Sequence, residues 1–460
     1  MRYPLLFLFS TFAWSQPPAD RELARSIFKE LIEINTTDSS GDNTRAAQAM
    51  AARLKSAGFP DSDIAVLAPA PRKGNLIARI HGTGGGKPLL FLAHLDVVEA
   101  RREDWSFDPF TFLERDGYFY GRGTQDIKDE AALYVATFMR LRREGFQPRR
   151  DLILALTSDE EGGPHNGVHW LLEAHRDLID AAFCVNGDAG GVQVQGVKRL
   201  LLGIQAAEKT FYSFRLEVKN RGGHSSLPEK DNAIYRLAEG LTRLSQFVFP
   251  VHLNPITQSF FERTGALDSG PDSADFRAVA KAPPDAAAAA RLSERPIYNA
   301  LLRTTCIPTM LAGGHAENAL PQTAAVTVNC RLVPGDLPDA VQREIVRVLA
   351  DTAVSVTPVR PSVPSPFSPV PRELLDLVGR VGSEVWPGLP VVPLMETGGT
   401  DGIYLRVAGI PTYGIAAVFT DLNDIRAHGK DERIAVKAFY DGLDFDYQLV
   451  RALGTSTDIK

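Results

Sequence analysis

The sequence predicts an α/β protein in which a mostly parallel sheet forms a catalytic domain that is interrupted by an inserted α+β domain. Before Lys209, short and continuously apolar runs alternate with helical patterns, which is typical of parallel strands buried on both faces. After Lys209, runs such as Phe211–Lys219 alternate apolar and polar residues, as half-buried strands of an antiparallel sheet do. A segment with five prolines, residues 361–371, then precedes a return to the first pattern.

Composition and charge narrow the class of protein. Of the 460 residues, 44% are apolar and 23% are charged, which argues against a disordered, collagen-like or disulfide-scaffold protein. The formal net charge of −6, without a long basic block, argues against nucleic-acid binding. The three cysteines, Cys184, Cys306 and Cys330, are too few for a zinc ribbon or an iron–sulfur protein. A bound metal would therefore need histidine and carboxylate ligands.

Residues 1–15 have the pattern of a signal peptide. Arg2 gives a short positive region, and residues 5–13 form an apolar stretch too short to span a bilayer. Ala13-Trp14-Ser15 is a small-x-small cleavage site, which places the mature N-terminus at Gln16. We therefore expect a protein exported to the periplasm or secreted, the alternative being a buried or disordered N-terminal strand. No later segment is long enough to span a membrane.

The elements of the first part follow from apolar periodicity. Two helices are expected first, at 20–34 and 43–57, and Gly58 closes the second. Buried strands then alternate with helices. The expected strands are 76–80, 89–93, 152–157 and 182–185, and the expected helices are 127–143 and 168–175.

The pattern beyond Lys209 predicts the inserted domain. Its expected strands are 211–219, 304–311, 325–332 and 354–359, and its expected helices are 232–247 and 337–350. Residues 254–299 are expected to form either a helical excursion or a loop. After the proline-rich linker, apolar patterns resume at 374–385, 412–416 and 435–453. The predicted organisation is a catalytic domain in two parts, 16–206 and 361–460, around an inserted domain, 207–360.

Acids and histidines follow the buried strands at their carboxyl ends. His94 and Asp96 follow one strand, Glu160 and Glu161 follow a second, and Asp188 follows a third. These positions converge where open α/β sheets bind their ligands. An aspartate that opens a helix and a histidine in a late loop complete a set without thiolates. The candidate metal ligands are His94, Asp126, Glu161, Asp188 and His428.

Such a donor set predicts a site for zinc, with cobalt or manganese as alternatives. Two metal ions that share one bridging carboxylate would need about five protein ligands, the number of candidates. In His94-x-Asp96 both side chains project to the same side, so Asp96 can orient the His94 ring. Of Glu160 and Glu161, one can bind metal while the other acts as general base.

The motifs run in order from about residue 90 to 433, and together they resemble a family of dinuclear zinc metallopeptidases. That family includes glutamate carboxypeptidase, succinyl-diaminopimelate desuccinylase, aminoacylase and carnosinase-type dipeptidases. The matching segments are His94-Leu95-Asp96, Gly121-Arg122-Gly123-Thr124-Gln125-Asp126, Asp159-Glu160-Glu161-Gly162-Gly163, Gly222-Gly223-His224-Ser225, Asn318-Ala319-Leu320-Pro321, Asn329-Cys330-Arg331, Gly399-Thr400-Asp401 and Ala427-His428-Gly429.

The resemblance implies a role for each metal-site residue. His94 and Asp188 look like the ligands of one zinc ion, and Glu161 and His428 like those of the other. Asp126 looks like the bridging carboxylate. Asp96 looks like the orienter of His94, and Glu160 like the general base.

The resemblance also implies that the inserted domain is a lid that is often used for homodimerisation. In it, His224 would stabilise the oxyanion, and Arg331 and Asn318 would hold the substrate carboxylate or nearby groups. Thr400 would line the pocket. The alternatives are a turn residue for His224 and Asn318, and a solvated edge charge for Arg331.

These expectations predict an exported zinc hydrolase that cleaves short peptides, as a dipeptidase or a carboxypeptidase, through a metal-bridged hydroxide. One alternative is an N-acyl amino acid deacylase on the same site, and another is an inactive binding protein on the same fold. Asp188 is typical of the dipeptidase and aminopeptidase branches, whereas the segments at Thr400 and His428 look more like the carboxypeptidase S-like branch. A nucleotide-binding enzyme is disfavoured because Gly82–Gly86 lacks a following Gly-Lys-Ser/Thr.

Two of the cysteines offer a separate expectation. Cys306 and Cys330 lie on strands that are expected to pair, so in an exported protein they either form a cross-strand disulfide or remain buried thiols. A Cα separation beyond about 7 Å would exclude the disulfide.

Overall fold

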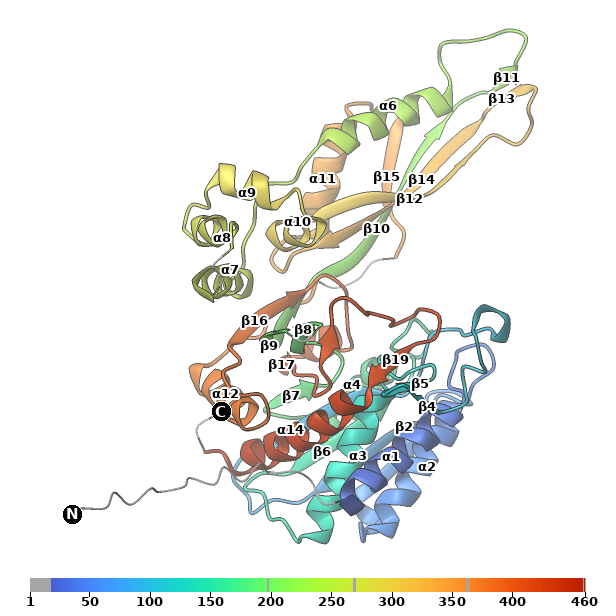
Figure 1. Ribbon diagram of the computed structural model, residues 1–460. Helices are drawn as coiled ribbons and strands as arrows, with labels where there is room; N and C mark the ends of the chain where they lie inside the picture. The colour runs from blue at the N-terminus through green and yellow to red at the C-terminus, as the bar shows by residue number, and fades with distance from the viewer. Residues whose placement is uncertain (1–17, 197, 268–269, 361–363, 458, 460) are drawn as a thin grey trace, which may run out of the picture. The chain divides into compact units, whose positions relative to one another are not determined.

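The computed structural model describes residues 18–196, 198–267, 270–360, 364–457 and 459 (Figure 1). The predicted signal peptide, residues 1–15, lies outside these described residues. The described chain folds into two compact units. The first unit contains the residues up to Leu202 together with Pro371–Val391 and the chain from Ile415 onward, and the second contains Gly203–Val370 and Val392–Gly414.

The first unit is built on a sheet whose central strands are parallel, which confirms the predicted α/β class. The central strand β3 pairs in parallel with β6 and β7, and β2 and β1 extend the sheet in the antiparallel sense beyond β6. The side chains of β3 and β6 are buried along their whole length. The strands are β1 (Ile64–Leu67), β2 (Asn75–Ile80), β3 (Leu89–His94), β6 (Leu152–Thr157) and β7 (Phe183–Asn186).

Helices with apolar faces pack within this unit. The helix α3 (Lys128–Arg143) contacts β3 and three other helices, α1 (Pro18–Glu33), α2 (Asn43–Ser56) and α14 (Val436–Thr455), which lie beside it in Figure 1. Aromatic rings fill this contact, and Phe91 of β3 meets Phe138 of α3 edge to face. The remaining helices of the unit are α4 (Gly167–Ala174), α5 (Arg176–Ile179) and α12 (Arg372–Val385).

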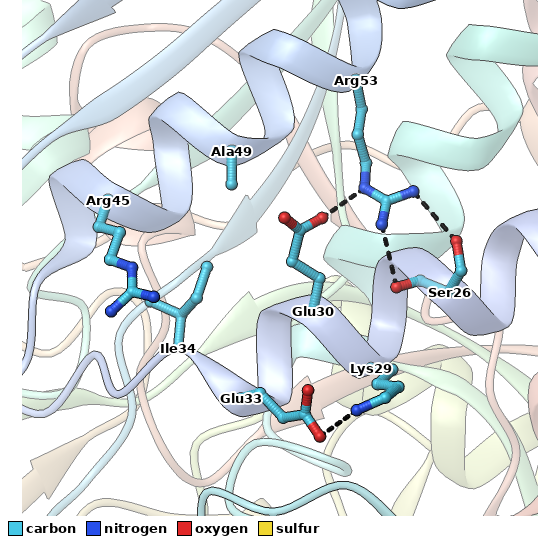
Figure 2. Close-up of a pocket in the computed structure, with 8 residues that line it drawn as sticks. All are labelled: Ser26, Lys29, Glu30, Glu33, Ile34, Arg45, Ala49 and Arg53. Atoms are coloured by element: carbon cyan, nitrogen blue, oxygen red, sulfur yellow. Dashed lines mark hydrogen bonds and ion pairs between the residues drawn. The ribbon is translucent and has the colours of Figure 1, made fainter.

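A groove of about 400 Å³ is lined by residues of α1 and α2 (Figure 2). Its charged side chains are largely paired with one another. Arg53 binds Glu30 at 2.5 Å and also the Ser26 hydroxyl, and Lys29 pairs with Glu33 one helical turn away. Because most of these charges are paired, the groove presents no concentrated charge to a ligand.

Short strands complete the first unit. β4 (Leu113–Arg115), β5 (Tyr118–Tyr120) and β19 (Arg433–Ala435) form a small antiparallel sheet in the order β19-β5-β4. This pairing places the residues that follow β5 opposite those that precede β19. Two further strands, β8 (Gly191–Gln195) and β18 (Thr420–Asp421), pair in parallel.

Residues Val392–Gly414, which belong to the predicted catalytic part 361–460, are grouped with the second unit. Their strands β16 (Val391–Glu396) and β17 (Thr412–Gly414) both pair with β9 (Lys198–Glu208), and β17 also neighbours β7 in the same sheet. In addition, Arg406 of α13 (Gly402–Val407) forms a buried ion pair with Glu208 at 2.5 Å. The predicted domain bounds therefore stay a prediction.

The second unit also contains a separate sheet of four antiparallel strands in the order β12-β14-β10-β15. The alternating apolar pattern predicts such a sheet. Helices α6 and α11 contact one another and the strands of this sheet, and Leu237 of α6 and Ile345 of α11 enter the shared core. The elements are β10 (Thr210–Lys219), β12 (Thr305–Gly313), β14 (Thr323–Leu332), β15 (Val354–Pro358), α6 (Ala233–Gln246) and α11 (Pro338–Leu349), with the short strands β11 (Gly223–His224) and β13 (Ala319–Leu320) paired separately.

The segment that the sequence left open, residues 254–299, is helical where it is described. It forms α7 (Pro255–Leu267), α8 (Ser273–Val279), α9 (Ala286–Leu292) and α10 (Pro296–Leu302). Phe261 and Phe276 are buried between these helices. The buried Lys209 donates three hydrogen bonds, to the Ala300 and Arg303 carbonyls and to the Thr305 hydroxyl, so it caps the end of α10.

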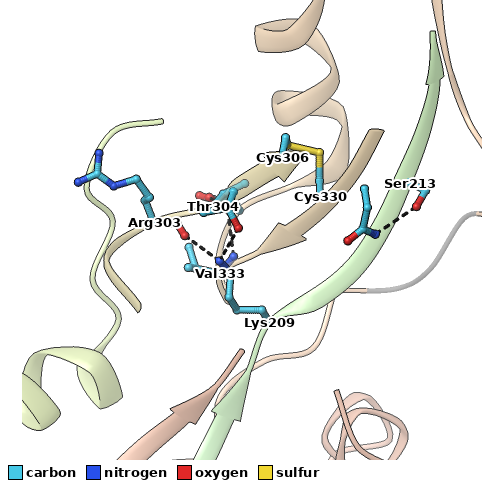
Figure 3. The surroundings of a disulfide bond; sticks show 10 residues. Lys209, Ser213, Arg303, Thr304, Cys306, Cys330 and Val333 are labelled. Atoms are coloured by element: carbon cyan, nitrogen blue, oxygen red, sulfur yellow. Dashed lines mark hydrogen bonds between the residues drawn. A yellow bond between two sulfur atoms is a disulfide. The ribbon is translucent and has the colours of Figure 1, made fainter. Parts of the chain in front are cut away.

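A disulfide joins the edge strand β12 to its neighbour β14 (Figure 3). Cys306 lies directly opposite Cys330, with their Cα atoms 4.0 Å apart. The cross-strand disulfide that the sequence allowed is therefore present. The third cysteine, Cys184, is free and buried in β7, as expected of an apolar strand residue.

Replacing Cys306 and Cys330 with serine is expected to lower the free energy of unfolding by about 3 kcal/mol, since the bond closes a loop across a sequence separation of 24 residues. Urea unfolding of the full chain, with and without reductant, measures this loss. Reductant should destabilise the native protein and leave the double variant unchanged. Equal stability of the two proteins without reductant would contradict the prediction.

Among the described residues, no helix is both long enough and apolar enough to cross a bilayer.

Candidate metal centre

The five predicted metal ligands all lie in the first unit, and the structure brings them together. His94 ends β3, Glu161 follows β6 and Asp188 follows β7, so the carboxyl ends of three neighbouring strands converge. Asp126 precedes α3, and His428 lies in the loop before β19. These five side chains therefore gather at one end of the sheet, and their roles as metal ligands stay predictions.

Asp126 lies between two groups of side chains. Its Oδ1 is 3.1 Å from His94 Nε2, and its Oδ2 is 3.1 Å from His428 Nε2. On the first side, His94 Nε2 is also 3.8 Å from Asp188 Oδ1. On the second side, His428 Nε2 is 3.0 Å from Glu161 Oε2. One carboxylate thus faces two imidazoles with its two oxygens, which is the arrangement of a bridging ligand.

Neighbouring oxygen and nitrogen atoms are close enough to surround cations. Ligand atoms of His94, Asp126 and Glu161 all lie within 4.8 Å of one another, and so do those of His94, Glu160 and Asp188. The donors are imidazole nitrogens and carboxylate oxygens, which suit zinc, cobalt and manganese. The residues present therefore fit the pair of metal ions that the sequence predicted. Glu160 lies on the side of His94 and Asp188.

The orientation of His94 differs in detail from the prediction. Its Nδ1 donates to the backbone carbonyl of Asp96 at 3.0 Å, whereas the Asp96 carboxylate is 3.7 Å away. The carboxylate instead accepts the backbone N–H of Glu161 at 2.9 Å, and Glu161 lies two positions after Asp159 in the segment that follows β6. A carbonyl can only accept, so Nδ1 carries a proton, and Nε2 is the nitrogen that can bind a metal once it has lost its own proton.

The charges of the centre shift the pKa values of its imidazoles. Hydrogen bonds to Asp126 and Glu161 raise the pKa of His428 to about 10. Burial lowers the pKa of His94, but Asp126 and Asp188 outweigh it and hold that pKa well above its usual value. Burial would raise the pKa of Asp126, but the two imidazoles hold it well below its ordinary value. Cation binding would therefore have to displace protons from both rings.

The turn that carries Glu160 and Glu161 rests on a buried aspartate that the sequence did not single out. Asp159 is 2% exposed and has a left-handed backbone, with φ of 61°. Its Oδ1 binds Lys73 Nζ at 2.5 Å, and its Oδ2 accepts the backbone N–H of His165. Lys73 also binds Asp38 at 2.5 Å. A strained turn of this kind persists only where neighbouring contacts hold it.

Lys73→Met is expected to lower the free energy of unfolding by about 3 kcal/mol, because it leaves Asp159 buried without its counter-ion. It should also lower kcat, since the turn that carries Glu160 loses its anchor. The matched control is Lys55→Met, which removes an exposed pair with Asp61 and should change stability very little. Urea unfolding and steady-state rates check both variants. Equal losses in the two would contradict this role of Lys73.

The four predicted substrate residues lie in the second unit. His224 is in β11, Asn318 precedes β13, Arg331 is in β14 and Thr400 precedes α13. The backbone N–H of Thr400 donates to Glu208 at 2.7 Å, and its hydroxyl accepts the N–H of Gly402. Each side chain has a defined local environment, but their roles toward a substrate stay predictions.

Two of these residues have environments suited to binding. His224 Nδ1 accepts the backbone N–H of Ser226 at 3.2 Å, so in the neutral ring Nε2 carries the proton and can donate. Arg331 lies over the Phe211 ring at 4.9 Å. Within the described part of the chain, Arg331 pairs with no carboxylate. By contrast, the backbone carbonyl of Asn318 accepts the Ser225 N–H, as that of a turn residue would.

Comparisons with known proteins give the family context of this centre. The family described as Peptidase family M20/M25/M40 matches residues 90–452. The chain is 30% identical over 370 residues to an N-fatty-acyl-amino acid synthase/hydrolase PM20D1 of Xenopus tropicalis, which covers 79% of this chain and 72% of that protein. It is 28% identical over 373 residues to the probable carboxypeptidase S-like 2 of Dictyostelium discoideum, with coverages of 79% and 71%.

Solved structures share the fold. A metallo-carboxypeptidase from Sulfolobus solfataricus superposes with a TM-score of 0.68 at 16% identity and covers 94% of this chain and 99% of its own. This likeness confirms the predicted fold class.

Proposed function

We propose that this chain, which belongs to Peptidase family M20/M25/M40, is a two-zinc hydrolase of short peptides that bear a free carboxylate. Members of the family to which it is similar show that it is an enzyme acting on peptide or N-acyl amide bonds. The observation that carries the two-metal site is the position of Asp126, with one oxygen at 3.1 Å from each of two imidazoles. Cobalt or manganese could occupy the same donors. His94 and Asp188 would hold one cation, and Glu161 and His428 the other.

Residues of this chain carry the proton and bind the charged groups of the substrate. When bound, the cations polarise the substrate carbonyl and lower the pKa of water. Glu160 accepts the proton of the attacking water at a carboxylate oxygen and delivers it to the leaving nitrogen. His224 donates from Nε2 to the developing oxyanion. Arg331 binds the substrate carboxylate, with Asn318 and Thr400 lining the pocket.

A second candidate, hydrolysis of N-acyl amino acids, is favoured by the Xenopus relative, whose name states that activity. Both reactions cleave an amide next to a free carboxylate and use the same metal site. They differ in what lies on the acyl side of the bond. The substrate panel therefore has to contain both classes.

The test measures metal content and amine release on the same purified protein. Dipeptides and N-acyl amino acids, including long-chain ones, are assayed before and after chelation and after zinc is restored. About two metals per chain, with peptide turnover lost on chelation and recovered with zinc, supports the proposal. Turnover of N-acyl amino acids alone moves the conclusion to the second candidate. Activity that is indifferent to the chelator contradicts the metal mechanism.

We also propose that the second unit forms a homodimer through the edge strand β12. This strand ends the four-stranded sheet, and its Ile307, Met310 and Leu311 are 64%, 70% and 73% exposed. An exposed apolar edge strand is an unusual surface for a monomer, and antiparallel pairing with a second copy would cover it.

The dimer is tested by light scattering of the full chain. Met310→Lys combined with Leu311→Glu should convert a dimer to a monomer. The matched control is Leu337→Glu, which charges an apolar residue of the same unit that is 62% exposed and lies outside the strand. A native protein that is monomeric, or a control that dissociates equally, overturns the proposal.

Export to the periplasm or outside the cell is proposed on two grounds. The N-terminal pattern predicts cleavage before Gln16, and the Cys306–Cys330 disulfide is of a kind that persists in oxidising compartments. Expression of the chain with its residues 1–15 in a bacterial host, followed by fractionation and N-terminal sequencing, tests this. An uncleaved chain that stays in the cytoplasm contradicts export.

A further inference from the structure

A buried ion pair lies beside the metal centre and belongs to no ligand. Arg122 is 2% exposed and Glu432 is fully buried, and Arg122 Nη1 binds Glu432 Oε2 at 2.5 Å. The two residues are 310 positions apart in the chain. The pairing of β5 with β19 brings them together, since Glu432 directly precedes β19 and Arg122 follows β5 by two residues.

Glu432 organises the turn that carries Asp126. Its Oε1 accepts the backbone N–H groups of Gln125 at 2.7 Å and of Asp126 at 3.1 Å. Its Oε2 accepts the N–H of Gly123 at 3.1 Å in addition to the Arg122 guanidinium. A single carboxylate thus receives four N–H donors, three of them from the turn that ends in Asp126. This fixes the backbone from which the bridging carboxylate projects.

Arg122 reaches in the other direction, to the loop of His428. Its Nη2 donates to the backbone carbonyls of His428 at 3.3 Å and of Gly429 at 3.2 Å. Its guanidinium stacks over the Trp105 ring at 5.0 Å. His428 has a left-handed backbone, with φ of 62°, and a side chain that is 54% exposed. The loop therefore depends on such contacts for its position.

The two imidazoles are thus held in different ways. His94 is 2% exposed at the end of a central strand and is fixed by its own bond to the Asp96 carbonyl. His428 is half-exposed, and its backbone carbonyl accepts a hydrogen bond from the Arg122 guanidinium. A change at Arg122 should accordingly act on the side of His428 first.

We propose that Arg122, held by Glu432, is a positioning residue that sets the affinity of the cation held by Glu161 and His428, with a much smaller effect on the cation held by His94 and Asp188. The inference rests on the proposed two-metal site. The Arg122 guanidinium binds both the His428 loop and Glu432, and Glu432 binds the Asp126 turn. The ligands around the cation held by Glu161 and His428 therefore keep their spacing. Replacing a residue that holds a metal ligand in place typically lowers the metal affinity by about 10- to 100-fold.

The sharpest variant is Arg122→Lys. A lysine keeps the positive charge beside Glu432 but lacks the fork that reaches both carbonyls. The matched control is Arg406→Lys in the second unit, where Arg406 likewise binds a buried glutamate, Glu208, at 2.5 Å and donates to a backbone carbonyl. Both variants lose a buried guanidinium, but only one of them lies beside the metal centre.

The experiment titrates the metal-free full chain with Co²⁺ and follows both the heat of binding and the visible absorption of the bound ion. Native protein should take up two equivalents. Arg122→Lys should weaken the second equivalent about 10- to 100-fold and the first by less than about threefold, and Arg406→Lys should leave both unchanged. If Arg122→Lys does not fold by circular dichroism, Arg122→Gln, which also removes the guanidinium that reaches both carbonyls and leaves the Glu432 contacts to the Asp126 turn in place, takes its place with the same expectation.

Each result decides the question. Fewer than two equivalents in the native protein overturns the two-metal proposal itself. Two equivalents in the native protein with unchanged constants in Arg122→Lys, or with both constants weakened alike, overturns the positioning role and leaves the two-metal proposal standing. If Arg406→Lys weakens cobalt binding as much as Arg122→Lys does, the effect comes from lost stability, and the positioning role of Arg122 is overturned.

Discussion

Glu160→Gln is expected to lower kcat by about 10²- to 10⁴-fold while the protein retains both cations. Glutamine keeps the size of the side chain and one oxygen, but it cannot accept and return a proton at neutral pH. The predicted ligands are other residues, so metal content should not change. The measurement is kcat and KM on the best substrate of the panel, together with the metal content of the same sample.

The adjacent residue provides the control for this variant. Glu161→Gln makes the same chemical change one position along the chain, where the carboxylate lies 3.0 Å from His428 Nε2. It should reduce metal occupancy as well as rate, and added zinc should restore part of the rate. The two variants separate a proton carrier from a ligand. The assignment of Glu160 is wrong if its variant loses a cation as Glu161→Gln does, or if kcat falls by less than tenfold.

The parts of the fold that could be predicted are those with a local signal. The runs at 89–93 and 152–157 are continuous apolar stretches, and they are the central strands β3 and β6. A residue that directly follows such a strand is thereby placed at the edge of the sheet. This is why the sequence alone predicts that His94 and Glu161 lie close together.

Residues whose role depends on pairing far along the chain could not be found in this way. Lys73 and Asp159 are 86 positions apart, and Arg122 and Glu432 are 310 apart. The position of Asp159 beside Glu160 and that of Glu432 near His428 were visible, but nothing in the sequence names their buried partners. The place of β17 between β7 and β9 in the sheet likewise depends on pairing between strands far apart in the sequence.

The prediction for Asp96 shows how side-chain direction limits such reasoning. Alternation along an extended segment predicts Asp96 on the same side as His94, and the Asp96 carboxylate lies 3.7 Å from His94 Nδ1. The actual contact to Nδ1 comes from the Asp96 carbonyl, since its carboxylate is engaged by the Glu161 N–H. Sequence patterns place a residue near its neighbour, but the competition between backbone and side-chain acceptors is decided only by the folded geometry.

Asp126→Asn is expected to have the second large effect, because it removes the charge between the two imidazoles. An amide presents one acceptor oxygen, whereas the bridging position requires two. Both cations should bind more weakly, each by about 10-fold or more, and kcat/KM should fall by about 10³-fold or more at limiting metal. Zinc titration with competing chelator and a parallel rate measurement check this. Two tightly bound cations in the variant would show that Asp126 is not the bridge.

The same variant has a separate signature in the metal-free protein, where Asp126 pairs with His94 and His428. The raised pKa of His428, about 10, contributes stability that is fully present below its unfolded pKa of about 6.5 and is lost as pH rises through about 10. The lowered pKa of Asp126 contributes stability above its unfolded value of about 3.9 that is lost as pH falls further. The free energy of unfolding of the chelated native protein should therefore exceed that of chelated Asp126→Asn by the largest amount between about pH 4 and 6.5. This difference should shrink as the pH approaches 10. Urea unfolding at pH 5, 7 and 9.5 measures it, and a difference that grows with pH would show that the imidazoles are not held in their charged forms by this carboxylate.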